Sequence, residues 1–420
     1  MFKKNVILLG LSALLAASLT GCGKPSQTVD LTQRIIGNSA TNDPVSPADA
    51  VVATEFGVRL FQQSIKTSSE ETENTLISPV SVLYALSMTA NGAEGETLAQ
   101  MENVLGASVS ALNKYLYDYR TSLPQGDKYQ LKSANSIWFR DSADFTVKED
   151  FLVANVNWYD AGIYKAPFNS STVKDINKWV SDNTDKMIPG ILNEIPAEAV
   201  MYLINALSFD AEWDIIYKEN QIRKDIFTEE DGTQYKTELM YDEEHAYLKD
   251  DNAQGFLKYY KDKKYAFAAL LPDEGIRIAD YIETLKGESL HQLLANPISS
   301  TVQTAIPKFE VSYDTEMSSL FQELGMTNAF DPNAANFSGI SSVSHADGNL
   351  YINRILHKTY ISVDERGTRA GAVTAVEMDA LGALLEPPIT LYLNRPFVYM
   401  IIDCEENVPL FIGTMMTVRP

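Results

Sequence analysis

Cysteine is nearly absent from this chain of 420 residues, which contains only Cys22 and Cys404. Two cysteines cannot form a disulfide framework, so packing must supply the stability of the fold. No Cys-x-x-Cys pair occurs, and no His-Glu-x-x-His pattern occurs either. We therefore expect no zinc site, and we expect neither a metal nor another cofactor. The chain has four histidines: His245, His291, His345 and His357.

The sequence also lacks the common signatures of catalysis. It has no Gly-x-Ser-x-Gly elbow and no Walker-type phosphate loop. The acidic pairs Glu243-Glu244 and Glu405-Glu406 could suggest a glycosidase. Adjacent carboxylates point to opposite sides of a strand, however, and such pairs are typical of solvated surfaces. We predict no catalytic residue and a protein that is not an enzyme.

Basic residues are scarce. The chain has 34 Lys and Arg against 56 Asp and Glu, which gives a formal net charge of −22. This charge argues against nucleic acid or an anionic membrane surface as a partner, and it favours a soluble monomer. With 420 residues the chain can bury a large core, as one large domain or two ordinary ones.

The N-terminus has the pattern of a targeting segment. Lys3-Lys4 precede an apolar run from Val6 to Leu19, which is too short for a stable membrane span. The run ends in Leu19-Thr20-Gly21-Cys22, which is similar to a bacterial lipobox. We expect a signal peptide over residues 1–21, a lipid on Cys22, and a location in the bacterial cell envelope, on the periplasmic face or the cell surface. A plain secretory signal with a chance cysteine is the alternative.

The remaining chain reads as one domain. Residues 22–45 are polar with little periodicity, which predicts a flexible tether. Ser46-Pro47 has the form of a helix start. No internal repeat, low-complexity run or second linker follows, so we predict a single domain over 46–420.

The most informative stretch lies near the C-terminus, at residues 364–382. Read with a period of two from Thr368 onward, its charges Arg369, Glu377 and Asp379 all fall on one side. This is the pattern of a strand with one buried face, although Ala and Gly are poor strand formers. An amphipathic helix is the alternative from these residues alone. The opposite side is small or apolar: Thr368, Ala370, Ala372, Thr374, Val376, Met378 and Ala380.

Motifs around this stretch resemble those of the serpins, inhibitors that trap serine or cysteine proteases. Glu365-x-Gly367-Thr368 is similar to the hinge of the serpin reactive loop, and the C-terminal signature of the family follows in Asn394-Arg395-Pro396-Phe397 and Pro409-Leu410-Phe411-Ile412-Gly413. The resemblance extends upstream over nearly the whole chain. Its other motifs are Ser78-Pro79-x-Ser81, Gly92-Ala93-x-Gly95-x-Thr97, the strand Tyr202–Phe209, Pro307-Lys308-Phe309-Glu310 and Leu356–Tyr360.

The resemblance implies an α+β fold of three β-sheets surrounded by eight or nine helices, with an exposed C-terminal reactive loop. It also implies an ion pair between Glu365 and Lys308 where the loop begins, and it places Trp213 in the breach at the upper end of the main sheet. A buried polar cluster called the shutter is expected from four residues: Ser78, Ser81, Asn205 and His357. The hinge would comprise Gly367, Thr368, Arg369, Ala370, Gly371, Ala372, Val373 and Thr374.

Two classes of function stay open: a suicide-type protease inhibitor, and a non-inhibitory binding protein on the same fold. A lipid-anchored hydrolase is a distant third. Insertion of the loop into the sheet demands small inward side chains, and the hinge provides them, which favours the inhibitor. Arg369 and Gly371 depart from the usual Glu and Ala, but both project outward. The expected partners are a target protease, held as a covalent acyl complex, and the membrane through the N-terminal lipid.

In inhibitory serpins the cleaved bond lies about fourteen residues beyond the hinge glycine. Here that bond joins Leu381 to Gly382. A leucine suits the specificity pocket of chymotrypsin-like or elastase-like proteases. Because the loop is long, three other residues are alternative cleavage sites: Met378, Leu384 and Leu385.

Overall fold

The computed structural model describes residues 28–35, 46–67, 73–123, 129–261, 263–341, 349–368 and 388–419. Its α-helices are α1 Pro47–Thr67, α2 Pro79–Ala90, α3 Gly95–Leu105, α4 Val109–Ser122, α5 Glu149–Tyr159, α6 Ser170–Asn183, α7 Ile278–Thr284, α8 Gly287–Ala295 and α9 Ser318–Glu323. Its strands are β1 Val29–Asp30, β2 Leu76–Ile77, β3 Tyr129–Arg140, β4 Gly162–Ala166, β5 Met201–Glu212, β6 Ile222–Thr228, β7 Gln234–Lys249, β8 Ala253–Tyr259, β9 Tyr265–Pro272, β10 Ile298–Pro307, β11 Phe309–Glu316, β12 Leu356–Val363, β13 Gly367–Thr368, β14 Ile389–Tyr392, β15 Phe397–Asp403 and β16 Val408–Met415.

The main sheet has seven strands in the order β1-β4-β3-β5-β13-β12-β11. Its longest ladder joins β3 and β5 over their whole length, from Tyr129 opposite Ala211 to Phe139 opposite Met201. The two-residue strand β13 pairs with Glu212 and Ala211 at the C-terminal end of β5. The short strand β4 pairs with the other end of β3. Strands β13 and β1 therefore lie toward opposite ends of this sheet.

The remaining strands form a second hydrogen-bonded network, in the order β14-β10-β7-β8-β9-β15-β16-β2 with β6 also on β7. The long strand β7 joins two sheets in this network. Its first residues, 234–240, pair with β6, residues 239–247 pair with β10, and residues 246–249 pair with β8. The predicted α+β fold of three sheets and eight or nine helices is confirmed, with nine helices in the described part of the chain.

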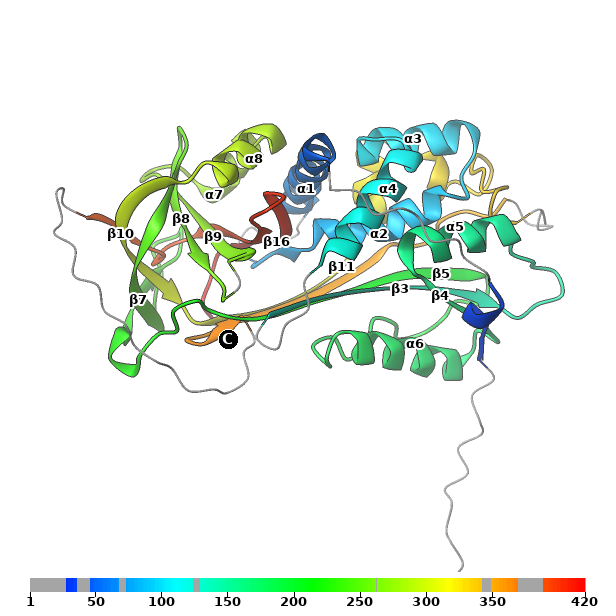
Figure 1. Cartoon of the computed structure of the whole chain (residues 1–420), viewed down its shortest axis with the longest axis horizontal. Coiled ribbons are helices and arrows are strands. Elements are labelled where there is room, and N and C mark those ends of the chain that lie inside the picture. The colour runs from blue at the N-terminus through cyan, green and yellow to red at the C-terminus, as the bar shows by residue number, and fades with distance from the viewer. Residues whose placement is uncertain are drawn as a thin grey trace, which may run out of the picture.

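The helices lie on both faces of the main sheet. Figure 1 shows α2, α4 and α5 on one face of β3, β4 and β5, and α6 alone on the opposite face. The larger hydrophobic core includes Leu207, Phe209 and Ala211 of β5. A smaller core beneath α6 includes Ile204 of the same strand. Odd-numbered residues of β5 thus face the larger core and even-numbered residues face α6, as the period of a strand requires.

Local chemistry explains where the main elements begin. Helix α2 starts with Pro79 in its first turn, and the Ser78 hydroxyl accepts a hydrogen bond from the Ser81 amide at 3.4 Å. Helix α6 starts with a reciprocal capping box between Asn169 and Thr172. Strands β9, β15 and β16 are buried at every residue, and their sequences are apolar except for Asp403 and Thr414.

The prediction of a flexible tether over residues 22–45 is wrong for residues 28–35. Strand β1 pairs with β4, with Val29 opposite Lys165 and Asp30 opposite Tyr164. The Leu31 amide donates to the Ile163 carbonyl at 2.8 Å, and the Thr28 hydroxyl donates to Asp175 of α6 at 2.7 Å. Backbone pairing at an open sheet edge needs no apolar pattern, so the polar sequence gave no signal for it.

Candidate functional site

The predicted ion pair where the C-terminal loop begins is present in the structure. Lys308 Nζ lies 2.8 Å from Glu365 Oε2 and 3.2 Å from Glu238 Oε2. Partial burial alone would lower the pKa of Lys308, but the hydrogen bonds to both carboxylates outweigh it and raise that pKa. The hydrogen bond from Lys308 lowers the pKa of Glu365. Glu238, on β7, is a partner that the sequence motif did not reveal.

Trp213 donates hydrogen bonds to the backbone just before β13. Its amide donates to the Arg366 carbonyl at 2.8 Å, and its indole Nε1 donates to the Asp364 carbonyl at 2.9 Å. The Tyr217 amide donates to the Glu365 carbonyl at 2.9 Å. Three consecutive carbonyls are therefore held by the segment that follows β5, as expected for a residue in the breach.

A buried charge cluster lies beneath Trp213. The Lys258 ammonium is 2.9 Å from Asp242 Oδ2 and 2.7 Å from Glu244 Oε1, and all three side chains are largely buried. Lys258 Nζ also lies 4.4 Å from the centre of the Tyr217 ring. Burial raises the pKa of Glu244, because the charged form loses solvation. The sequence motifs gave no indication of this cluster.

Strand β13 is the point where the hinge enters the main sheet. Thr368 is 2% exposed, and its hydroxyl lies 2.5 Å from the Tyr260 hydroxyl. It faces the larger core, the side predicted from the alternation of small and charged residues. A Cβ on Gly367 would lie 2.0 Å from the Ala211 carbonyl oxygen, so this approach to β5 admits only glycine.

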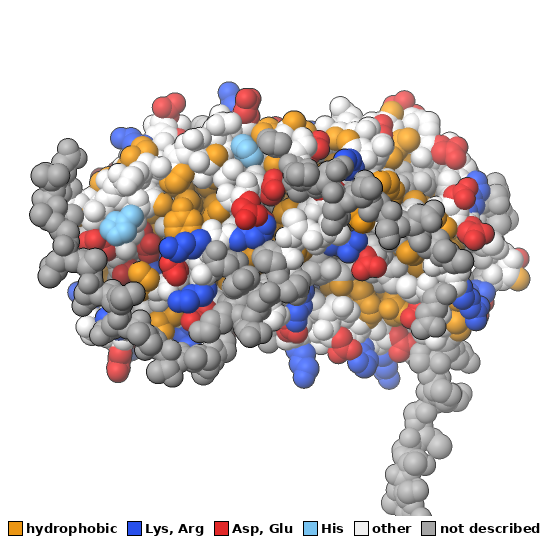
Figure 2. All heavy atoms as spheres, in the orientation of Figure 1, with side chains coloured by type: hydrophobic (Ala, Val, Ile, Leu, Met, Phe, Trp, Pro, Cys, Tyr) orange, Lys and Arg blue, Asp and Glu red, His pale blue; other side chains and the backbone are white. Residues whose placement is uncertain are grey.

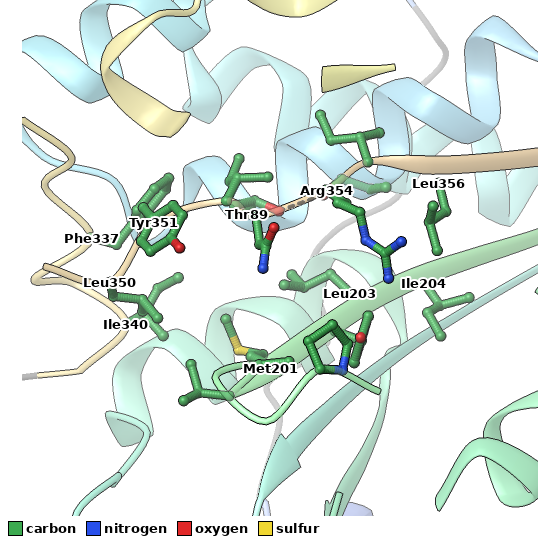
Figure 3. A pocket seen from close by; sticks show the side chains of 18 of the residues that line it. Thr89, Met201, Leu203, Ile204, Phe337, Ile340, Leu350, Tyr351, Arg354 and Leu356 are labelled. Atoms are coloured by element: carbon green, nitrogen blue, oxygen red, sulfur yellow. Dashed lines mark hydrogen bonds between the residues drawn. The ribbon is translucent and has the colours of Figure 1, made fainter. Parts of the chain in front are cut away.

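Beyond β13 the main sheet is open. In the described residues β5 and β12 are joined only through β13, by Val363 opposite Thr368 and Thr368 opposite Ala211. A cavity of about 590 Å³ lies between the other ends of the two strands. Figure 3 shows Leu203 and Ile204 of β5 on one side of it and Leu356 of β12 on the other. We call this opening between β5 and β12 the slot.

Two of the predicted shutter residues meet at the base of the slot. His357 is 5% exposed, and its Nε2 accepts a hydrogen bond from the Ser78 amide at 3.0 Å. The Ser78 hydroxyl donates to the Leu410 carbonyl at 2.8 Å. Burial lowers the pKa of His357 to about 4, although the nearby Asp314 opposes this effect. A neutral imidazole is required, because a protonated Nε2 could not accept the Ser78 hydrogen bond.

Asn205, the fourth residue predicted for the polar cluster, makes its hydrogen bonds to β3. Its Nδ2 donates to Ser133 Oγ at 3.1 Å and to Asn135 Oδ1 at 2.9 Å, both on β3. Within the described residues no hydrogen bond joins Asn205 to Ser78, Ser81 or His357, because the open slot separates β5 from β12. Asn205, Ser81 and His357 do line the same cavity. The alternating polar residues of β3 were the signal for its partners.

The other predicted site residues lie outside the described residues. These are Cys22, the hinge residues Arg369, Ala370, Gly371, Ala372, Val373 and Thr374, and the residues of the cleaved bond, Leu381 and Gly382. In the described part of the chain there is no group of three or more His, Cys, Asp or Glu that could hold a metal ion. None of the helices described is long and apolar enough to span a membrane.

The face shown in Figure 2 carries acidic and basic side chains interspersed, and its apolar atoms fall in small groups.

The fold and the site define a class of protein: an α+β domain whose main sheet is open beside the strand that begins a C-terminal loop. A family model described as serpin (serine protease inhibitor) matches residues 52–418. The chain therefore belongs to the serpin family.

Comparisons with individual proteins agree with this family assignment. The crystal structure of tengpin, a thermophilic serpin, in its native state is 45% identical, with a TM-score of 0.86 over 93% of this chain and 100% of that one. Tengpin in its latent state gives a TM-score of 0.78 over 90% of this chain and 100% of that one, also at 45% identity. Human serpin B9 is 28% identical over 85% of this chain and 96% of its own length. Membership of this family indicates protease inhibition, not catalysis, as the general function.

Proposed function

We propose that this protein is a suicide-type inhibitor of serine proteases whose reactive loop, once cleaved, inserts into the slot between β5 and β12. The open slot beside the buried Thr368 is the observation that carries the proposal. A strand that enters the slot would pair with both edges and satisfy backbone groups that β13 leaves unpaired. Serpin loop insertion is itself a standard example of a switch that releases strain stored in a metastable fold.

The register of β13 fixes where an inserted loop would lie. Thr368 stands opposite Ala211 of β5 and opposite Val363 of β12, and both pairings are antiparallel. Continuing the two ladders without a bulge brings Thr374 between Asn205 and His357. Even-numbered loop residues would face the larger core, as Thr368 does. These are the small or apolar side chains Ala370, Ala372, Thr374, Val376 and Met378.

The lining of the slot suits these side chains. The cavity is bordered mainly by apolar residues, including Val82 and Leu86 of α2. Small apolar side chains can therefore be buried there without leaving polar groups of the lining unpaired. Asn205 Oδ1 is buried and has no hydrogen-bond partner among the described residues. The Thr374 hydroxyl of an inserted loop would supply a donor to it. A buried acceptor that lacks a partner until the loop arrives favours the inserted state.

The same register supports cleavage after Leu381. Met378 would stand opposite Met201, which is the first residue of β5. Leu381 would then lie three residues past the end of the strand, so the attached protease would stay outside the sheet. The protease nucleophile attacks the Leu381 carbonyl and forms an acyl bond, and Gly382 becomes the new amino terminus. The leucine favours chymotrypsin-like or elastase-like targets.

The location is proposed from the sequence. The lipobox at Cys22 would attach the mature protein to the bacterial cell envelope by a lipid. Thr28 is the first described residue of the docked segment, and five residues, 23–27, lie between it and Cys22. The six residue steps from Cys22 to Thr28 span at most about 20 Å, which would keep the edge of the main sheet at β1 close to the membrane.

Incubation with chymotrypsin, pancreatic elastase and trypsin tests the function. We expect an SDS-stable complex with chymotrypsin or elastase, and none with trypsin. Ala370→Glu is the matched variant, because residue 370 would face the larger core in the inserted strand, where a carboxylate without a partner would cost several kcal/mol. This variant should be cleaved without forming the complex, whereas Ala370→Val should still form it. Cleavage of the wild type with no complex under any condition would identify a non-inhibitory binding protein instead.

A further inference from the structure

Lys258 is a buried lysine to which the proposed function assigns no role. It lies on β8, beside the last residues of β7 (Figure 1), and its side chain is 3% exposed. Its Nζ lies 2.9 Å from Asp242 Oδ2 and 2.7 Å from Glu244 Oε1, both on β7. Burial alone would lower the pKa of Lys258, but Tyr217 and the two carboxylates outweigh it and raise that pKa. The amine therefore stays charged at neutral pH.

Two carboxylates fix this charge at one point. The Asp242 carboxylate is itself held, because the Gln221 side-chain amide donates to its other oxygen at 3.2 Å. An apolar side chain of similar volume is often as stabilising as a buried ion pair, so overall stability does not require a lysine here. What an apolar side chain could not supply is a positive charge at a defined position. The surroundings of that charge indicate its role.

Two aromatic rings lie within reach of the ammonium. Lys258 Nζ is 4.4 Å from the centre of the Tyr217 ring and 5.6 Å from the centre of the Trp213 ring. Tyr217 is 4% exposed and Trp213 is fully buried. A cation within about 6 Å of a ring face attracts it, most strongly where both are removed from water. The Lys258 charge therefore attracts both side chains from the same point.

Both rings belong to residues 213–217, which we call the entry segment. Within the described chain residues 214–217 lie outside the helices and strands, between β5 and a 3-10 turn at Glu219–Gln221. Such a segment lacks the repeated backbone hydrogen bonds of a helix or sheet, so its position depends on how its side chains are anchored. One anchor of Trp213 is the ring of Tyr260, stacked at 4.5 Å between centres. The Lys258 ammonium supplies a second anchor, and it reaches Tyr217 as well.

The entry segment receives the first residues of the loop. Its Trp213 and Tyr217 amides donate to the carbonyls of residues 366 and 365, and the Trp213 indole donates to that of residue 364. These three hydrogen bonds immediately precede β13, which sets the register between β5 and β12. A displacement of the two aromatic residues would therefore displace the strand that a cleaved loop has to extend.

We propose that Lys258 is a positioning residue for loop insertion, whose ammonium holds the entry segment where it aligns β13 with both edges of the slot. The proposal rests on loop insertion as the proposed function. Without the charge, the entry segment samples other positions, and the cleaved loop enters the slot more slowly. Hydrolysis of the acyl bond then competes better with insertion, so more inhibitor is cleaved without trapping the protease.

A neutral replacement of the cluster tests this role without leaving a buried carboxylate unpaired. The neutral variant combines Lys258→Met, Asp242→Asn and Glu244→Gln. The chain offers a matched control in Lys264, a second buried lysine that contacts two carboxylates, those of Asp403 and Glu405. The control variant combines Lys264→Met, Asp403→Asn and Glu405→Gln.

Hydrogen exchange of the intact protein, followed by mass spectrometry of peptides that span the entry segment, gives the direct readout. We expect the Trp213 and Tyr217 amides to exchange about tenfold faster in the neutral variant and at the wild-type rate in the control. In reactions with chymotrypsin, the neutral variant should release several-fold more cleaved inhibitor per complex than the wild type or the control. Combined with Trp213→Phe, the neutral substitutions should add little to the effect of Trp213→Phe alone.

These measurements separate the proposal from the proposed function. If exchange in the entry segment is unchanged in the neutral variant, or rises equally in the control, Lys258 does not hold the segment. If exchange rises but the cleaved fraction does not, the segment does not limit insertion, and the positioning role is refuted. If the wild type forms no complex with any protease, the proposed function fails, while the exchange rates still decide whether Lys258 holds the entry segment.

Discussion

Acidification should weaken the fold through His357, and the structure gives the size of the effect. The pKa of His357 is about 4 in the folded protein, against 6.5 for an ordinary histidine. Below pH 6.5 the unfolded chain binds a proton that the folded protein does not, so stability falls as the pH falls, down to about pH 4. Between pH 7.5 and pH 5 the free energy of unfolding should fall by about 2 kcal/mol from this group alone.

Thermal unfolding at the two pH values measures this loss. For a domain of this size, about 2 kcal/mol corresponds to a fall in Tm of roughly 2–3 °C. His357→Gln is the control, because an amide oxygen can accept the Ser78 hydrogen bond but does not titrate in this range. The pH dependence of the variant should therefore be smaller by that amount. If wild type and variant lose the same stability between pH 7.5 and pH 5, then His357 is not the buried neutral acceptor described above.

Three further predictions concern single positions. Glu365→Gln should cost about 0.2–1 kcal/mol in urea unfolding, because the Lys308 and Glu365 side chains are 26% and 37% exposed, and a larger loss from this variant would contradict the assignment. Lys308→Met should cost more than Glu365→Gln, because Lys308 also holds Glu238. The intact mass of the mature protein should correspond to a chain that begins at Cys22 with added acyl groups, and an unmodified N-terminus elsewhere would exclude the lipid anchor. The C-terminal fragment released by chymotrypsin should begin at Gly382, whereas a fragment that begins at Asp379 or Leu385 in the stable complex would move the cleaved bond.

Much of the site could be predicted from residue order alone. The alternation of small and charged residues after Gly367 depends only on the period of a strand, and Thr368 lies on the buried side that it predicts. The motifs around Glu365 and Lys308 indicated a pair that the structure shows at 2.8 Å. Ser78 and Pro79 marked the start of α2, because capping is a property of a few adjacent residues. Strand period and helix capping are local, so the sequence contains all the information they need, whereas the resemblance to the serpins implied the pair of Glu365 and Lys308, which are 57 positions apart.

Features that depend on which distant segments become neighbours could not be predicted in this way. Trp213 holds the carbonyl of Asp364, 151 positions along the chain, through its indole. The partners of Asn205 follow from the register of β3 and β5, and the docking of β1 follows from an edge that β4 leaves open. The slot itself exists because β13 separates β5 from β12 at one end only. Periodicity determines which side of a strand a residue occupies, whereas long-range pairing decides what it faces there.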